Sequence, residues 1–448
     1  MKPTYIVSGI ILIGTSLFFS SCSSKKSAYS DDIMYSDNYS ATKLSSVNAV
    51  PESGKILTRD EAIRIALANN PQIQIAKLQA IAANAQYYGS FAALTPGVNA
   101  GAGIVKSTGS PVASAAGISG SMNVWNGLTS QMNVLAAKSN AMSAEEMNRN
   151  ARRLLAEQTA FIYDSIIADK VNIKIQMDNK AFWENELKKI QRVKNPGKKA
   201  IADALQMKVY ADMAHSAVIK NIENFNNDKF ALATMMGMSN AKLPSNTLFP
   251  DAPHPSDEPK DMPNVNSYLD QAVNQRPDLY SAKDNVNAAN YNLYAAYGEL
   301  SPSVDAGVAA AAANINSQNV NFTAAGAAAN ANLNPVAPIT NIVNAQAQKD
   351  IAKEQLVQTY TQSMADVRTS YNNLASDYAQ NKILRAQESD ALQSRNLVTE
   401  RYNDGKTSIA DLTQAQNFLV NTQLEYYKTA IEIEKSKAAL DAAIGISQ

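Results

Sequence analysis

Few side chains in this 448-residue chain have chemistry suited to a covalent or catalytic role. Cys22 is the only cysteine, which excludes an intramolecular disulfide. It directly follows Phe19-Ser20-Ser21, which is similar to the lipobox that precedes the acylated cysteine of bacterial lipoproteins, although Phe19 departs from the usual leucine. We therefore predict that the Cys22 thiol carries lipid. The alternative is a stray cysteine at the end of a signal peptide.

The sequence predicts neither an enzyme nor a metal site. No nucleophile, base and orienting group form a recognisable set, and no GxxxxGK(S/T) phosphate loop occurs. His215 and His254 lack cysteine or carboxylate neighbours at metal-ligand spacing. Forty basic and forty acidic residues cancel, which argues against nucleic acid as a partner. We expect no catalytic residue, no cofactor and no metal.

The first 21 residues are typical of a signal peptide. Lys2 precedes an apolar run from Tyr5 to Phe19, which is shorter than the ~20 residues that a spanning helix needs. Residues 22–57 are then a polar, lipidated tether. Because one lipid gives only marginal membrane binding, a second anchor is expected downstream.

The sequence of the rest of the chain indicates an internal duplication. Pro71–Gly101 aligns without gaps to Pro277–Gly307, and the agreement resumes downstream. There, Gly197-Lys198 corresponds to Gly405-Lys406. We predict a first repeat over residues 58–240 and a second over residues 265–448. Six prolines make residues 241–264 an extended connector.

Long helices dominate both predicted repeats. Thr58 with Glu61 predicts a capping box for a helix that breaks at Asn70-Pro71 and continues toward Tyr88. Leu128 to Asn195 contains no glycine or proline and predicts a helix of roughly 100 Å. The other long helices are expected at Lys198–Met236, Ile339–Asp404 and Lys406–Ile444. In the last, apolar residues at three and four spacing predict a helix–helix seam: Ile409, Leu412, Leu419, Tyr426, Ile433, Leu440 and Ile444, interrupted by Gln416, Gln423 and Lys437.

Between the helices lie two pairs of candidate strands. They are expected at Val98–Val105, Gly117–Trp125, Val304–Ala313 and Val320–Leu333. Their alternation is poor, as is common for membrane barrel strands. Four strands cannot enclose a lumen, and open edges cannot face lipid. If these strands cross a membrane, several chains must share one barrel.

This pattern resembles the TolC-like outer-membrane efflux protein family. The residues that carry the resemblance are Leu57–Ile63 through Asn69-Asn70-Pro71, Leu94-Thr95-Pro96, Trp125-Asn126-Gly127, Tyr402–Gly405 and Ile409–Leu412. The resemblance implies a homotrimer with a twelve-stranded outer-membrane β-barrel, continued by a long periplasmic α-helical barrel. It further implies a passive exit duct for efflux or type I secretion. The implied partners are a periplasmic adaptor, an inner-membrane transporter and outer-membrane lipid.

The same resemblance implies a gate at the ends of the helical hairpins. An acidic residue at the Asp411 position and a tyrosine at the Tyr402 position help to hold the family's periplasmic end shut, and Asp203 is the counterpart of Asp411 in the first repeat. Thr407 and Gln414 stand where the best-known pattern has a basic and an acidic residue. The alternative is that Asp203 and Asp411 only start their helices.

The glycine turns, with Gly197, Lys198, Gly405 and Lys406, are the expected adaptor-docking tips. A rival interpretation of the whole chain is a periplasm-spanning coiled-coil structural lipoprotein without a pore. It shares the lipid, the helices and the duplication. It does not explain the paired strand insertions.

Overall fold

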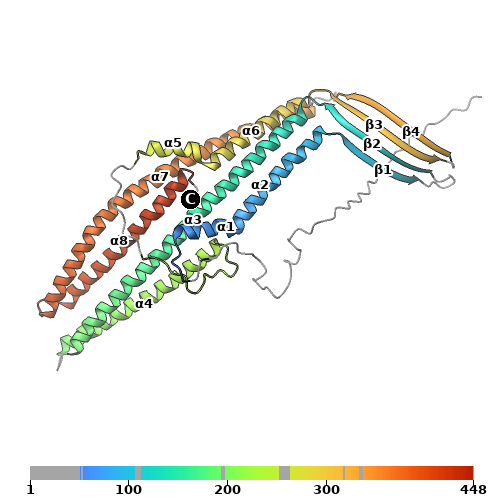
Figure 1. Cartoon of the computed structure of the whole chain (residues 1–448). Helices are drawn as coiled ribbons and strands as arrows, with labels where there is room; N and C mark the ends of the chain where they lie inside the picture. Colours follow the sequence, from blue (N-terminus) through green and yellow to red (C-terminus); the bar gives the residue numbers. More distant parts are fainter. Residues whose placement is uncertain are drawn as a thin grey trace, which may run out of the picture. The chain divides into compact units, whose positions relative to one another are not determined.

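The computed structural model describes residues 51, 54–105, 113–192, 197–251, 263–315, 318–331 and 336–446 (Figure 1). Among these residues the chain is mostly helical with one small sheet, as the sequence predicts. The predicted signal peptide and Cys22 lie outside the described residues. None of the described helices is both long and apolar enough to cross a membrane.

The two halves of the chain show the same order of α-helices and strands, and the first half has an additional 3-10 helix. The first half contains α1 (Arg59–Asn69), α2 (Pro71–Ser90), the 3-10 helix η3 (Phe91–Leu94), β1 (Gly97–Val105), β2 (Ala113–Trp125), α3 (Thr129–Gln191) and α4 (Lys198–Met235). The second contains α5 (Val265–Gln275), α6 (Pro277–Gly298), β3 (Ser303–Ile315), β4 (Gln318–Asn330), α7 (Val336–Asn403) and α8 (Ile409–Ala443). All four predicted strands and all four long helices are present.

Several predicted boundaries were wrong by a few residues. The second strand begins at Ala113 rather than Gly117, because an alanine and serine stretch carries no apolar alternation. The fourth ends at Asn330 rather than Leu333. The last helix begins at Ile409 rather than Lys406, because Ser408 is its N-cap. At α1 the Thr58 hydroxyl accepts a 3.3 Å bond from the Glu61 amide, which is the first half of the predicted capping box.

The structure divides into two compact units. We call the described residues of Ala82–Ala141 and Asn285–Lys353 the strand unit, and those of Ser40–Ile81, Met142–Asp284 and Glu354–Gln448 the helical unit. The division falls within α2, α3, α6 and α7. Each unit has its own packing.

In the helical unit, the residue before each helix-breaking proline also fixes the end of a long helix. Asn70 and Arg276 are both extended, as residues before proline must be. The Asn70 amide donates a 2.8 Å bond to the Met235 carbonyl at the end of α4. The Arg276 guanidinium donates a 3.1 Å bond to the Ala443 carbonyl at the end of α8. Both side chains thus satisfy carbonyls that a helix terminus would leave unpaired.

The predicted seam of α8 is confirmed. All seven of its apolar residues are buried. The interrupting Gln416 is buried as well, and its amide donates a 2.9 Å bond to the Asn179 side chain on α3. Gln423 donates a 3.1 Å bond to Glu388 on α7. These polar residues of the α8 seam therefore form hydrogen bonds to the helices packed against it.

The strand unit contains an antiparallel sheet in the order β1-β2-β3-β4. Directly paired residues share a face of a sheet, so the register assigns each described side chain to one of the two faces. One face, the polar face, carries Asn99, Ser119, Ser121, Asn123 and Asp305. The other, the apolar face, carries Val98, Ile104, Ile118, Met122 and Val308. The described side chains of β4 are exposed throughout.

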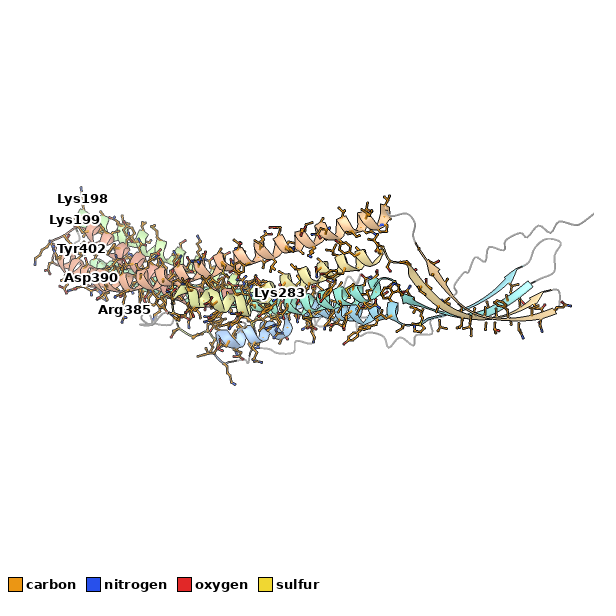
Figure 2. All side chains as sticks on the ribbon, turned by 90° about the horizontal axis from the view of Figure 1, so that it is seen from above. Lys198, Lys199, Lys283, Arg385, Asp390 and Tyr402 are labelled. Carbon is orange, nitrogen blue, oxygen red and sulfur yellow. The ribbon has the colours of Figure 1, made fainter. Side chains whose placement is uncertain are left out.

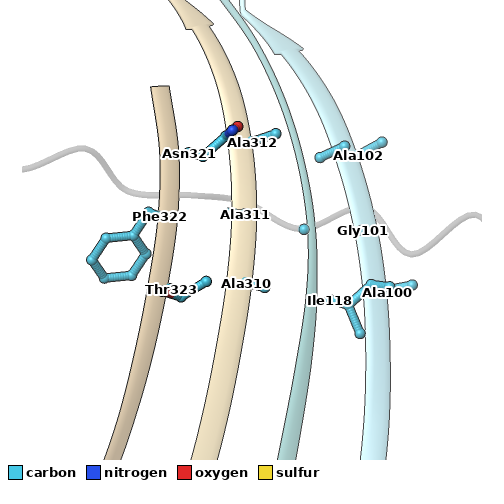
Figure 3. A pocket seen from close by; sticks show the side chains of 12 residues that line it. Ala100, Gly101, Ala102, Ile118, Ala310, Ala311, Ala312, Asn321, Phe322 and Thr323 are labelled. Atoms are coloured by element: carbon cyan, nitrogen blue, oxygen red, sulfur yellow. The ribbon is translucent and has the colours of Figure 1, made fainter. Parts of the chain in front are cut away.

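Part of β4 inverts this polarity. Phe322 belongs to the polar face, whereas Asn321 and Thr323 belong to the apolar face. Figure 3 shows Phe322 pointing away from the neighbouring Asn321 and Thr323. Its row across the sheet otherwise holds the small residues Ala311, Gly117 and Gly101. Small residues dominate the centre of the sheet, which explains why its sequence alternation is weak.

Candidate functional site

The turn between α7 and α8 is closed by a glycine in the left-handed region. Gly405 has φ +72°, and its amide donates a 2.9 Å bond to the Tyr402 carbonyl. The Lys406 amide donates a 2.9 Å bond to the Arg401 carbonyl. Glycine adopts this conformation without strain and is therefore the preferred residue after a helix. Gly197, by contrast, is the extended N-cap of α4 with φ −67°, so the two tip glycines have different roles.

Asp411 lies in the first turn of α8 and forms a full capping box. Its Oδ2 accepts bonds from the Ser408 amide at 3.0 Å and the Ser408 hydroxyl at 2.7 Å. Thr407 donates a further 2.6 Å bond to the same oxygen. These bonds, with the Thr407 hydroxyl as the largest cause, lower the pKa of Asp411 to about 2. The carboxylate is exposed and charged at neutral pH, and it is bound by the neutral hydroxyls of Thr407 and Ser408.

Tyr402 and Asp203 meet across the two hairpins. The Tyr402 hydroxyl on α7 donates a 2.9 Å bond to Oδ2 of Asp203 on α4. Burial raises the pKa of Tyr402, and the bond to Asp203 and its charge raise it further. Both side chains are half-buried. The structure therefore brings together two of the three predicted gate residues, whereas Asp411 bonds within its own turn.

Sequence reasoning missed the packing around this bond. Trp183 on α3, Met207 on α4 and Leu412 on α8 form a buried cluster against which Tyr402 packs. The Arg395 guanidinium on α7 lies 5.1 Å from the centre of the Phe182 ring on α3. Trp183, one of two tryptophans in the chain, was the available signal because a large aromatic in a polar helix needs a partner.

The predicted docking tips are exposed. Gly197, Lys198, Gly405 and Lys406 are all exposed, and Lys406 forms a 2.9 Å salt bridge with Asp404. Figure 2 shows Lys198, Lys199 and Tyr402 near the same end of the hairpins.

Within the part of the chain that the structure describes, no group of three or more histidine, cysteine, aspartate or glutamate residues could hold a metal ion. His215 is exposed on α4, and His254 lies outside the described residues. Arg276, Asp278 and Asp366 form a salt-bridged network in the helical unit, at 2.6 Å and 3.2 Å. This network supports the helix ends described above.

Comparisons with known proteins agree with this architecture. The family model "Outer membrane efflux protein" matches residues 268–446. The fold is similar to the CmeC outer membrane channel of Campylobacter jejuni, with 17% identity, a TM-score of 0.75 and coverage of 89% of this chain and 91% of that one. It is similar to the outer membrane protein VceC of Vibrio cholerae, with 17% identity, a TM-score of 0.76 and coverage of 86% and 96%. It is also similar to the open state of the MtrE outer membrane channel of Neisseria gonorrhoeae, with 16% identity, a TM-score of 0.73 and coverage of 87% and 89%.

Fold and matched sequence together define the class. The chain has the fold of the TolC-like channels over most of its length. Its second half, residues 268–446, matches the outer membrane efflux protein domain. The resemblance predicted from the sequence is confirmed.

Proposed function

We propose that three copies of the chain form one outer-membrane channel, the passive exit duct of a tripartite efflux or type I secretion system. The sheet carries this proposal. β1 and β4 are its outer strands, so each pairs on only one side within the described chain. Unpaired strand edges invite pairing with another chain and are not tolerated in lipid. Four strands from each of three copies would close a twelve-stranded barrel.

Exposed aromatic residues support a membrane boundary beside the sheet. Tyr88, Phe91, Trp125, Tyr294 and Tyr297 are exposed in the strand unit, where helices give way to strands. Tyrosine and tryptophan gather at membrane interfaces because their rings are apolar and their tips polar. The barrel is the second anchor that a single lipid on Cys22 would require.

The hairpin ends would form the periplasmic gate. In this proposal the Tyr402–Asp203 bond holds the hairpins of the two repeats together in the closed state, while Asp411 presents its charge to the pore. The exposed tips around Gly197, Lys198, Gly405 and Lys406 would dock a periplasmic adaptor, which connects the duct to an inner-membrane transporter. The shared order of elements supports two repeats, residues 58–240 and 265–448, joined by the connector 241–264.

Native mass spectrometry and planar-bilayer recording of the detergent-solubilised protein test the proposal. We expect a trimer that carries lipid on Cys22 and forms ion-conducting channels. A monomer or dimer would refute the shared barrel. A trimer that never conducts would favour the pore-free coiled-coil lipoprotein instead.

A further inference from the structure

Asp305 is the only ionisable residue on the four strands. Ionisable side chains are costly within membrane-spanning segments, so they are rare there and mark functional positions. Asp305 lies three residues into β3, directly paired with Asn123 of β2. It is half-buried on the polar face.

Both neighbouring strands hold the Asp305 carboxylate in place. The Asn123 amide donates a 2.8 Å bond to Oδ1, and the Asn330 amide of β4 donates a 3.3 Å bond to Oδ2. Both donors are neutral side-chain amides. No salt bridge to Asp305 occurs among the described residues.

The register shows which way this charge faces in a closed barrel. Trp125, paired with Val304, lies on the face opposite to Asp305 and is the side chain suited to a lipid interface. Val98, Ile118, Met122 and Val308 follow on that same face. Apolar side chains do occur on the polar face further along the sheet: Phe322 and Val320 pair with Ala311 and Ala313, about 20 Å or more along β3 from Asp305 at ~3.3 Å per residue. Near Asp305 the polar face is therefore the one that would line the lumen.

We infer that Asp305 is a selectivity-determining residue whose carboxylates, one from each copy, make the barrel lumen favour cations over anions. The inference rests on the proposed trimeric barrel. Twelve strands about 4.8 Å apart and tilted about 40° enclose a backbone diameter of roughly 24 Å. A wall carboxylate then lies about 9 Å from the axis, within the ~10 Å Debye length at 0.1 M salt and far beyond the ~3 Å at 1 M. Three such charges would raise the cation-to-anion ratio roughly fivefold at 0.1 M and almost not at all at 1 M.

Reversal potentials in planar bilayers test the charge. They are measured in an Asp203→Asn/Asp411→Asn background, which removes the candidate gate carboxylates. Asp305→Asn should lower the K⁺/Cl⁻ permeability ratio roughly fivefold near 0.1 M KCl and leave it unchanged at 1 M. Asp305→Glu should preserve the ratio, as should Asp270→Asn, a control at an exposed aspartate of α5. An unchanged ratio in Asp305→Asn overturns the inference, whereas the absence of any channel in the unaltered protein refutes the proposed function.

Thiol labelling tests the direction in which the side chain points. Because Cys22 is the only cysteine, Asp305→Cys introduces a single new thiol in the barrel. A membrane-impermeant, negatively charged methanethiosulfonate reagent should label Asp305→Cys and restore cation preference. The neighbouring Ala306→Cys, on the apolar face, should resist labelling. The reverse labelling pattern would place Asp305 outside the lumen and overturn the inference.

Discussion

The Tyr402 hydroxyl donates a 2.9 Å hydrogen bond to Asp203 Oδ2 across 199 residues of sequence. The bond joins α7 of the second half to α4 of the first, beside the buried Trp183, Met207 and Leu412. It is charge-assisted, which makes such bonds stronger than neutral ones. A change in the relative position of the two hairpins would break it, as expected of a latch.

Tyr402→Phe should therefore open the channel. The substitution keeps the ring in its cluster and removes the hydroxyl. Hydrogen bonds to charged groups contribute about 1.5–3 kcal/mol, so the open-to-closed ratio should rise roughly tenfold or more. Single-channel recording measures this ratio directly. Tyr360→Phe, at an exposed tyrosine of α7, is the matched control. Equal open times in both variants would show that the bond does not hold the gate.

Asp411 should contribute to cation block rather than to the latch. With its pKa near 2, the carboxylate is charged at every physiological pH. Asp411→Asn should weaken block of the channel current by a multivalent cation added on the periplasmic side, and Asp203→Asn/Asp411→Asn should weaken it further. Unchanged block in the double variant would show that neither aspartate contributes to cation block.

The same lowered pKa predicts how acid affects the hairpin end. A carboxyl group whose folded pKa lies below its unfolded value of 3.8 stabilises the fold above that value and loses this effect as pH falls toward 2. Amide hydrogen exchange at Ile409–Thr413 should therefore stay slow down to about pH 4 and accelerate below it, after correction for intrinsic rates. Asp411→Asn should lack this acceleration. Identical pH profiles in both proteins would count against the capping role.

Sequence predicted this fold well because its strongest signals are local. Glycine and proline mark the ends of the helices in both halves of the chain. The spacing of Ile409, Leu412 and Leu419 predicts the buried seam of α8 directly. The Tyr402–Asp203 hydrogen bond could not be predicted from the sequence, because no local pattern links an aspartate of α4 to a tyrosine of α7. The role of Asp411 stayed open for a different reason: Ser408-x-x-Asp411 is both a capping pattern and a charge at a tip.

Asp164 on α3 should make the stability of the helical unit depend on pH. Burial raises its pKa to about 7, while Arg59 lowers it and Glu434 raises it again. The Arg59 guanidinium lies 3.6 Å from Asp164 and 3.7 Å from Glu434, and Lys435 and Glu432 also act on the site. The unfolded group releases its proton near 3.8 and the folded group near 7. Stability therefore falls as pH rises between these values and is level above them.

Asp164→Asn should remove this loss. The variant should be more stable than the unaltered protein at pH 8, by at most a few kcal/mol, and similar at pH 4. Thermal unfolding of the detergent-solubilised protein, followed by circular dichroism at both pH values, gives the comparison. Asp178→Asn, at an exposed aspartate of α3, is the control. A difference between variant and unaltered protein that is equal at both pH values would contradict the raised pKa.

The strand unit depends on a close approach of two glycines. Gly127, between β2 and α3, has φ +67°, and a Cβ there would collide with the Gly298 carbonyl oxygen and with the Ser301 side chain. A Cβ on Gly298 would collide in turn with the Gly127 carbonyl oxygen. The neighbouring Leu128 also has a positive φ of 67°, so the turn already holds a conformation that costs L-residues energy. The Trp125 indole donates a 3.0 Å bond to the Ser301 hydroxyl beside this contact.

Gly127→Ala should consequently destabilise the strand unit by about 2–5 kcal/mol, because left-handed strain of ~1–2 kcal/mol adds to overpacking of ~1–3 kcal/mol. The colliding carbonyl belongs to backbone and cannot turn aside as a flexible side chain could. We expect a lower melting temperature of the protein and less of it in the outer membrane. Gly326→Ala is the matched control, since a Cβ at Gly326 of β4 would meet nothing within 4 Å. Should Gly127→Ala melt at the same temperature as Gly326→Ala, the Gly127–Gly298 contact cannot be what fixes the junction between β2, α3 and α6.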